Sequence, residues 1–288
     1  MTATVRAHAA GVTAWTALAR HAGLARVLAR PGGAAFVTAG DDVLWLGPLE
    51  APLHPRAVLV AAPSRAAVGA DVRVDLTGVT PWRPAPLALD ASGVATLRAG
   101  WLTLAGSLAS LGAPAGFGAL LVEAPLAFPL DGAHDLARAL AEACARDDAG
   151  AAAPAALALL GLGGGLTPSG DDFVGGALFA RRLLAASGAG DAEGWRRVAD
   201  AIRVAAPSRT HPISAALLGD LAHGSGHAPL HELVAALATS DLARAGDAAG
   251  RLVRLGHSSG WDILAGFATG LAATTRATRS GSPAPLVP

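Results

Sequence analysis

The sequence predicts an α+β protein in which a β-rich N-terminal part precedes a mainly α-helical C-terminal part. Up to about residue 95, short apolar runs alternate with Gly, Pro and Asp, and residues 71–76 alternate polar with apolar side chains, as a half-buried strand does. From residue 97 onward, apolar side chains recur at helical spacing. We therefore expect a β-rich part over residues 1–95 and a mainly helical part, which carries the site, over residues 96–278. The Ser- and Pro-rich tail, residues 279–288, is expected to be disordered.

Within these two parts, an element is expected wherever a periodic run lies between turn-forming residues. Residues 1–30 fit either a helix or an entry strand. The expected strands are residues 35–38, 43–46, 57–61 and 72–76, with residues 86–90 as one more candidate. The expected helices are residues 99–111, 134–146, 154–160, 173–186, 195–205, 213–222, 229–239 and 263–275. One α+β unit and two separate domains both remain open at this point.

Composition excludes several classes of function. The 288 residues carry 22 cationic and 22 acidic side chains, so the net charge is zero and no basic stripe for nucleic acid is expected. The chain has no lysine, which excludes a lysine-dependent phosphate loop or Schiff base. The single cysteine, Cys144, excludes a disulfide framework and favours a cytoplasmic location. The longest apolar stretch, residues 149–166, is interrupted by Pro154 and four glycines, so no membrane span is expected.

Two short segments of the helical part share one pattern. Ser169-Gly-x-Asp172 and Ser259-Gly-x-Asp262 each precede an apolar run, and they are separated by a constant offset of 90 residues. The pattern is a capping box with Asp in place of Glu, in which Ser caps the first helical turn and Asp reaches back to the Ser amide. Losing such a cap costs on the order of 1 kcal/mol. Capping alone would explain each segment taken separately.

Three features of these turns point beyond capping to a ligand site. Gly163, Gly164 and Gly165 precede the first helix start and expose backbone amides near the positive end of the helix dipole, where phosphates and carboxylates bind. Asp171 is not needed for the capping box, so it is free to orient a substrate, take a proton or hold a cation. The same pattern occurs twice, and two helix starts that face each other would form one pocket for a small anion.

Further candidates lie between the two turns and beside the second. Arg209 can form a bidentate hydrogen-bonded pair with a carboxylate or phosphate, and Thr210 is placed to cap the next helix. His257 lies directly at the second turn and, with Asp171, is the predicted catalytic residue. The predicted substrate-binding residues are Gly163, Gly164, Gly165, Thr167, Ser169, Gly170, Asp172, Arg209, Thr210, Ser214, Ser258, Ser259, Gly260 and Asp262.

Other glycines and histidines suggest structural roles. The glycines at 175, 176, 266 and 270 lie inside expected helices, where glycine costs roughly 1 kcal/mol relative to alanine. Close helix–helix packing explains them best, and it would bring the two helix starts together. His223, His227 and His231 have spacings that suggest a metal only weakly, because the residues between the first two are typical of a loop. We predict no metal site and no cofactor.

The two turns resemble those of a known bacterial family. Gly161-Leu-Gly-Gly-Gly-Leu-Thr-Pro-Ser-Gly-Asp-Asp-Phe173 and Leu255-Gly-His-Ser-Ser-Gly-Trp-Asp262, with Thr210 and Ser214 between them, resemble the AllH-like family, formerly a domain of unknown function. This family is typified by the AllH subunit of the oxamate carbamoyltransferase of allantoin catabolism. The resemblance covers residues 155–275, with one departure at Gly164, where the family commonly has proline.

The resemblance implies a reaction and partners. The reaction would be phosphorolysis of oxalurate to oxamate and carbamoyl phosphate, or the reverse transfer. The partners would be small anionic substrates such as phosphate, carbamoyl phosphate and oxamate, together with other subunits of a carbamoyltransferase complex. Neither nucleic acid nor a membrane is expected as a partner.

Two alternatives from other classes remain open beside this carbamoyltransferase. A metal-dependent hydrolase would hold Mg²⁺ or a similar ion with Asp171, Asp172, Asp262 and His257, because hard oxygen ligands suit such ions. A non-catalytic assembly subunit would use the caps and glycines for packing only. The sequence favours a carbamoyltransferase, or a subunit of one, over both.

Overall fold

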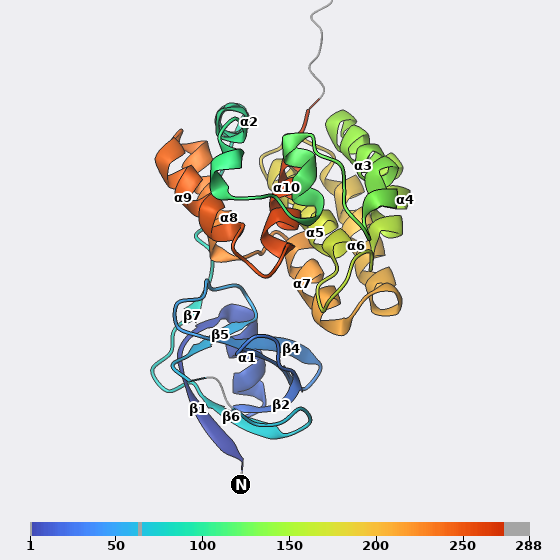
Figure 1. The fold of residues 1–288 in the computed structure, drawn as a ribbon. Helices are drawn as coiled ribbons and strands as arrows, with labels where there is room; N and C mark the ends of the chain where they lie inside the picture. Colours follow the sequence, from blue (N-terminus) through green and yellow to red (C-terminus); the bar gives the residue numbers. More distant parts are fainter. Residues whose placement is uncertain (1, 63–64, 274–288) are drawn as a thin grey trace, which may run out of the picture.

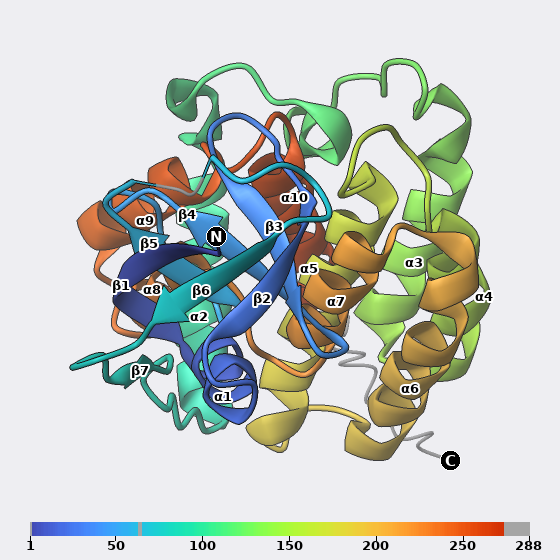
Figure 2. The same cartoon turned by 90° about the horizontal axis from the view of Figure 1, so that it is seen from below.

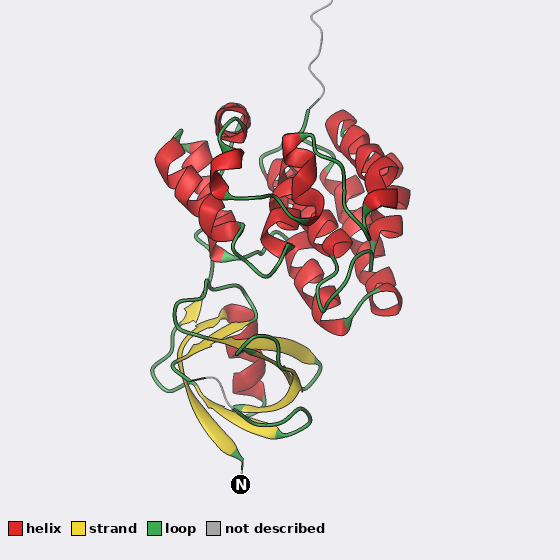
Figure 3. Ribbon diagram, viewed as in Figure 1, coloured by secondary structure: helices red, strands yellow, loops and turns green. Residues whose placement is uncertain are grey.

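The computed structural model describes residues 2–62 and 65–273, and it has the α+β architecture that the sequence predicts. A β-rich N-terminal part is followed by a mostly helical C-terminal part, and the two lie one below the other in Figure 1. The strands are confined to the N-terminal part (Figure 3). The tail that we expect to be disordered, residues 279–288, lies outside the described residues. None of the described helices is both long and apolar enough to cross a membrane.

The N-terminal part is a sheet that closes on itself. Its elements in chain order are β1 (Ala3–Gly11), α1 (Val12–Arg20), β2 (Leu24–Ala29), β3 (Ala35–Ala39), β4 (Asp42–Gly47), β5 (Ala57–Val60), β6 (Asp71–Asp75) and β7 (Pro81–Trp82). The strand order is β5-β4-β3-β2-β6-β1-β7, and a further pairing of β5 with β1 closes the sheet. Strand β1 pairs parallel with β6 over its first residues and antiparallel with β5 from Ala7 onward, and the pairing with β5 contains a bulge between Ala7 and Ala9.

The patterns predicted for this part are present, with one exception. Val72 and Val74 of β6 are buried while Asp71 and Arg73 are exposed, as the alternation predicts. Residues 1–30 contain both of the elements considered there, since strands β1 and β2 flank helix α1. The candidate strand at residues 86–90 is wrong. That segment pairs with no strand of the described residues, and Pro84 and Pro86 provide no amide donor where it would begin, so the last strand is the short β7 at Pro81–Trp82.

The helical part surrounds one central pair of helices. Its elements are α2 (Ala91–Ala105), η1 (Leu108–Leu111), η2 (Gly116–Val122), η3 (Asp131–Ala133), α3 (His134–Arg146), α4 (Ala149–Leu159), α5 (Ser169–Ala186), α6 (Ala192–Arg209), α7 (Pro212–Ala222), α8 (Ala228–Ala238), α9 (Leu242–Leu252) and α10 (Ser259–Leu271). Helix α2 starts earlier than expected because Asp90 caps it by accepting from the Gly93 amide at 2.8 Å. The expected division at residue 95 therefore falls inside α2. Helix α9 was not expected, because its many Ala and Gly residues weaken the apolar periodicity.

Helices α5 and α10 form the central pair, and glycines allow their backbones to touch. A Cβ atom on Gly176 would overlap the carbonyl oxygen of Ile263, and one on Gly266 would overlap that of Phe173. Gly270 lies equally close to another carbonyl of α5. The close helix–helix packing predicted for these glycines is confirmed. It also places the starts of the two helices together, as the two-turn hypothesis requires.

The contacts of this pair are reciprocal at the 90-residue offset seen in the sequence. The Cβ position of Gly176 meets Ile263, which lies three residues before Gly266. In the same way, the Cβ position of Gly266 meets Phe173, which lies three residues before Gly176. The helix starts repeat this equivalence. A Cβ atom on Gly170 would overlap the Leu159 carbonyl at the end of α4, and one on Gly260 would overlap the Leu252 carbonyl at the end of α9. The segments α4–turn–α5 and α9–turn–α10 are therefore two copies of one arrangement, packed against each other.

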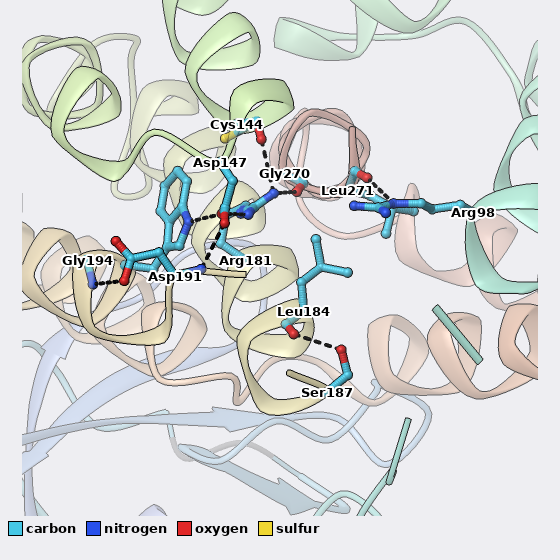
Figure 4. Close-up of polar contacts among 11 residues, drawn as sticks. Arg98, Cys144, Asp147, Arg181, Leu184, Ser187, Asp191, Gly194, Gly270 and Leu271 are labelled. Carbon is cyan, nitrogen blue, oxygen red and sulfur yellow. Dashed lines mark hydrogen bonds and ion pairs between the residues drawn. The ribbon is translucent and has the colours of Figure 1, made fainter. Parts of the chain in front are cut away.

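A buried guanidinium fixes the far ends of these helices (Figure 4). Arg181 of α5 donates through Nη1 to the carbonyls of Cys144 at 3.1 Å and Gly270 at 3.3 Å, near the ends of α3 and α10. Its Nη2 pairs with Asp147, and its charge lies 4.7 Å above the Trp195 ring. The Trp195 indole N–H also donates to Asp147 at 2.7 Å. A cation here stabilises two helix C-termini, where the dipole is negative.

The N-terminal part contacts the helical part through an ion pair and an apolar cluster. Arg56 donates through Nε and Nη2 to both carboxylate oxygens of Asp220 on α7, at 2.8 and 3.0 Å. Ile213, also on α7, is fully buried against Phe36 and Val43 of the sheet. Figure 2 shows α7 at the side of the sheet. Because α7 also packs on α5, it links the sheet to the helix that carries the first turn.

Replacing Gly266 with alanine is expected to lower the free energy of unfolding by about 1–3 kcal/mol, because α10 must move away from α5. Gly246 of α9 is a matched control. It also lies in a helix, but its Cβ position is surrounded by open space, so Gly246→Ala should raise the stability by roughly 0.5–1 kcal/mol. Urea unfolding followed by circular dichroism measures both. Effects of the same sign would contradict the close packing of α5 on α10.

Replacing Arg181 with methionine is expected to lower the free energy of unfolding by about 3–5 kcal/mol, because it removes the partner of Asp147 and strands two buried carbonyls. The control is Arg196→Met. Arg196 pairs with Glu193 and Asp200, but its side chain is 55% exposed, and such pairs contribute only about 0–1 kcal/mol. Thermal unfolding of both variants beside the wild type gives the comparison. A loss at Arg181 no larger than at Arg196 would show that its contacts contribute little.

Candidate functional site

The two turns are shaped by glycines in left-handed conformations. Gly161, Gly163 and Gly165 have φ angles of 75°, 111° and 89°, and Gly256 of the second turn has a φ of 59°. Side chains other than glycine rarely adopt such angles, so the first turn depends on its glycine run. Each turn leads directly from one helix end to the next helix start. The glycine motif therefore fixes the chain path between α4 and α5.

The two turns lie against each other and meet through pairs of hydroxyls. Thr167 Oγ1 lies 3.0 Å from Ser259 Oγ, and Ser169 Oγ lies 3.2 Å from Ser258 Oγ. Both distances are those of hydrogen bonds, and in each pair either hydroxyl can donate. Four predicted site residues from segments about 90 positions apart thus form one contiguous polar group.

The capping boxes expected from the sequence do not form. Helices α5 and α10 begin at Ser169 and Ser259 themselves, and neither helix start receives a side-chain cap. The amides of the first turns donate instead to backbone carbonyls, among them those of Pro168 and Ser258. The reason is that both serine hydroxyls are engaged across the interface between the turns. Contacts with the other turn have replaced the local cap that the pattern suggests.

Asp171 is the anchor of the first turn. Its side chain is 1% exposed and accepts from the Gly161 amide at 2.8 Å, from Ser214 Oγ at 2.6 Å, and from the hydroxyl of Thr210. Three donors saturate most of the acceptor capacity of a carboxylate. Asp171 therefore ties the turn to the α6–α7 corner, and Thr210 and Ser214 face this carboxylate.

Arg209 and His257 lie at the edge of the site. Arg209 donates through Nη1 to the Leu157 carbonyl at 2.9 Å, near the end of α4, so its guanidinium supports a helix C-terminus. His257 is exposed and forms no hydrogen bond to the described residues. Both side chains are exposed, and the bond to Leu157 occupies only Nη1 of Arg209.

Asp262 is fully buried on the second helix. Its Oδ1 accepts from the Phe117 amide at 2.6 Å, and its Oδ2 has no hydrogen-bond partner among the described residues. The loop fits closely, because a Cβ atom on Gly116 would overlap this carboxyl. Burial raises the pKa of Asp262 to about 7, against the lowering effects of the Phe117 amide and of the Ser169 and Ser258 hydroxyls.

Asp172, the counterpart of Asp262, is also buried, with 5% of its surface exposed. No backbone amide donates to it, and its Oδ2 likewise lacks a partner among the described residues. Burial first, and then the charge of Asp262, raise the pKa of Asp172 well above its usual range, while the Ser259 hydroxyl lowers it. The equivalent carboxyls thus sit in unequal surroundings: Asp262 accepts from a backbone amide, which favours its charged form, and no amide of the described residues donates to Asp172.

The free backbone donors of the site belong to the glycine run. The amides of Gly170 and Asp171 are used inside the turn, where they donate to the carbonyls of Leu162 and Pro168. The amides of Gly163, Gly164 and Gly165 donate to no group within the described residues. The glycine run therefore adds donors for an anion beside the first helical turn, several of whose amides are already used inside the turn.

Sequence reasoning missed three residues that contact the carboxyl pair or lie near it. Phe117 supplies the amide donor to Asp262 from a loop 145 positions away, and no local motif marks it. His54 and His227 line a small cavity together with Asp172. His54 comes from the loop before β5, and His227 was considered only for its spacing to other histidines. Within residues 2–62 and 65–273, no group of three or more His, Cys, Asp or Glu side chains is arranged to hold a metal ion.

The raised pKa of Asp262 gives a pH-dependent stability. A carboxyl whose pKa rises on folding, here from 3.8 to about 7, binds a proton more tightly in the folded state, so its contribution is full below pH 3.8 and is lost as the pH rises towards 7. Asparagine mimics the protonated form at every pH. Relative to the wild type, Asp262→Asn should gain stability over this interval, by up to about 1.4 kcal/mol per pH unit.

The measurement is urea unfolding of both proteins between pH 4 and 8. Taking the difference between them cancels the opposing effect of His54, His227 and His231, whose pKa values burial lowers. Asp135→Asn is the control, because the side chain of Asp135 is 87% exposed and its removal should leave the pH dependence unchanged. A constant difference between Asp262→Asn and the wild type would contradict the shift.

Comparison with known proteins identifies the segment that holds this site. Residues 159–271 match the family model described as oxamate carbamoyltransferase subunit AllH. The matched segment runs from the last residue of α4 to the last residue of α10, and it contains every predicted site residue. No curated protein and no solved structure matches the chain. The family match confirms the resemblance carried by the two turns, and it supports the assignment of this chain to an AllH-like family.

Proposed function

We propose that the chain is a subunit of an oxamate carbamoyltransferase-like enzyme. The reaction we propose converts oxalurate and phosphate to oxamate and carbamoyl phosphate, or runs in the reverse direction. The family description supports the class of enzyme. Support for the class of substrate comes from the two adjoining turns, because oxalurate, oxamate, phosphate and carbamoyl phosphate are all small anions and the turns present neutral donors.

One observation carries this proposal. The amides of Gly163 and Gly165 donate to nothing within the described residues, and they belong to the turn whose Thr167 hydroxyl meets Ser259 of the other turn. Free amides and hydroxyls at the starts of helices bind phosphate and carboxylate oxygens well, and here the positive ends of two helices lie together. Gly164 adds little as a donor, because proline is common there in the family.

The same arrangement suits carbamoyl transfer. Attack on a carbamoyl carbon places negative charge on its oxygen, and fixed amide donors stabilise such charge without reorganising. Holding two small anions in contact supplies much of the remaining rate enhancement. In this proposal Asp171 positions the glycine turn through its hydrogen bonds, and the exposed His257 is the general acid or base.

We further propose that the chain acts in the cytoplasm together with other subunits. The description of the matched family names a subunit, which supports a multisubunit assembly. The free thiol of Cys144 is buried, as suits a reducing compartment.

Titration calorimetry of the full chain with phosphate, carbamoyl phosphate and oxamate tests the proposal. Thr167→Val keeps the shape of the side chain but removes one hydroxyl of the site. Because a hydrogen bond to a charged group contributes about 1.5–3 kcal/mol, this variant is expected to bind phosphate or carbamoyl phosphate at least tenfold more weakly. Thr103→Val, at an exposed threonine of α2 outside the site, is the control and should bind as the wild type does.

Two results would contradict the proposal. One is the absence of binding of all three anions, both to the chain alone and to its complex with co-purified subunits. The other is a Thr167→Val variant that unfolds at a lower temperature but binds anions unchanged, which would assign the hydroxyl pairs to packing, as in a non-catalytic assembly subunit.

A further inference from the structure

A small cavity lies between the N-terminal sheet and the first carboxyl of the pair. It is lined by His54 and Pro55 of the N-terminal part, by Asp172 of α5, and by residues of α7 and the α7–α8 loop, including His227. Its volume is about 10 Å³. A cavity of this size accommodates one water molecule, provided that two to four polar atoms surround it.

Three polar atoms of the lining residues are unpaired. His54 Nδ1, His227 Nδ1 and Asp172 Oδ2 are each shielded from solvent, and none has a hydrogen-bond partner among the described residues. A buried polar atom left without a partner costs about 1–3 kcal/mol. Three such atoms on residues that line one cavity call for a common partner, because native proteins leave few such atoms unsatisfied.

The surroundings keep the two histidines neutral. The rings of His54 and His227 are 4.7 Å apart, so two positive charges there would repel each other. Burial, followed by the neighbouring His227 and Arg56, lowers the pKa of His54 well below 6.5, and burial together with His231 lowers the pKa of His227 to about 4. A neutral imidazole has one nitrogen that accepts a hydrogen bond.

We propose that this cavity is a binding site for a single water molecule, which connects the carboxyl of Asp172 to His54 and His227. The protonated Asp172 donates from Oδ2 to the water oxygen. The water donates its two hydrogens to Nδ1 of His54 and Nδ1 of His227, and both rings carry their own hydrogen on Nε2. All three unpaired atoms are then satisfied, and no net charge enters the cavity.

The connection gives the N-terminal part a role at the carboxyl pair. His54 becomes a positioning residue that holds the proton of Asp172 on the oxygen facing the cavity, while Asp262 keeps its Phe117 amide on the other side. The charged and titratable groups around this arrangement are Asp171 on α5, Asp262 on α10, the Arg56–Asp220 pair at α7, and His231 on α8, whose Nε2 accepts from the Gly226 amide at 2.9 Å. The water site requires no ligand at the turns, so it stands or falls independently of the proposed reaction.

Neutron diffraction from crystals of the full chain in heavy water tests the proposal. The expected result at pH 7 is one water in the cavity, a deuterium on Asp172 Oδ2, and deuterium on Nε2 rather than Nδ1 of both histidines. An empty cavity, an ionised Asp172, or a deuterium on either Nδ1 would overturn it.

Two substitutions test the same connection in solution. Asp172→Asn places an amide donor where the acid donates, so its X-ray structure should retain the water and its melting temperature should stay close to that of the wild type. Asp172→Leu removes the donor and should lose the water and melt at a lower temperature. Equal melting temperatures for the two variants would overturn the proposal.

His54→Phe provides a second measurement that does not depend on Asp172 being replaceable. It should remove the water and shift the carboxyl carbon titration of Asp172, observed by nuclear magnetic resonance, whereas His8→Phe, at an exposed histidine of the same sheet, should leave that titration unchanged. Should His54→Phe not fold, His227→Phe replaces the other acceptor and is read in the same way. An unchanged Asp172 titration in either folded variant would overturn the role of the water.

Discussion

The direct contact between the backbones of α5 and α10 is the constraint on which the site depends. Gly176 and Gly266 let each helix touch a carbonyl oxygen of the other, so the two helices have little freedom to slide or rotate. This contact sets the distance between the helix starts, and with it the meeting of Thr167 with Ser259 and the burial of the two equivalent carboxyls. A side chain larger than hydrogen at the crossing would push the two helices apart and so separate the two turns, although the crossing itself contains no residue of the site.

The central helices carry ionisable side chains that a protein interior normally excludes, and each of these side chains is accommodated in a different way. Asp171 is surrounded by donors, and Arg181 is matched by Asp147 and by helix-end carbonyls. Asp172, the immediate neighbour of Asp171, has almost no donors, and burial favours its neutral form. Two adjacent residues of one sequence thus have opposite environments, because neighbouring positions of a helix point to different sides.

The sequence allowed the α+β order, the two turns and the glycine packing to be predicted, because each leaves a local or periodic pattern. It misled us about capping, since the hydroxyls of Ser169 and Ser258 meet each other across 89 positions and no local pattern reports such a contact. The Phe117 amide and the His54 ring reach the carboxyls through tertiary packing alone. Helix α9 was not predicted, because alanine and glycine give only a weak apolar periodicity. The predicted start of α2 lies several residues after the observed one, because no apolar periodicity marks the turn that Asp90 caps.

The reciprocal packing of the two helix–turn–helix copies has the form of a two-fold symmetric dimer interface, in which each subunit offers the same surface to the other. In such a dimer, two copies of one residue on the axis must have identical surroundings. Covalent continuity removes that requirement. One chain can supply an amide to Asp262 and a polar cavity to Asp172, and so give two equivalent positions different proton affinities. A symmetric assembly of separate subunits could reach that state only by breaking its own symmetry.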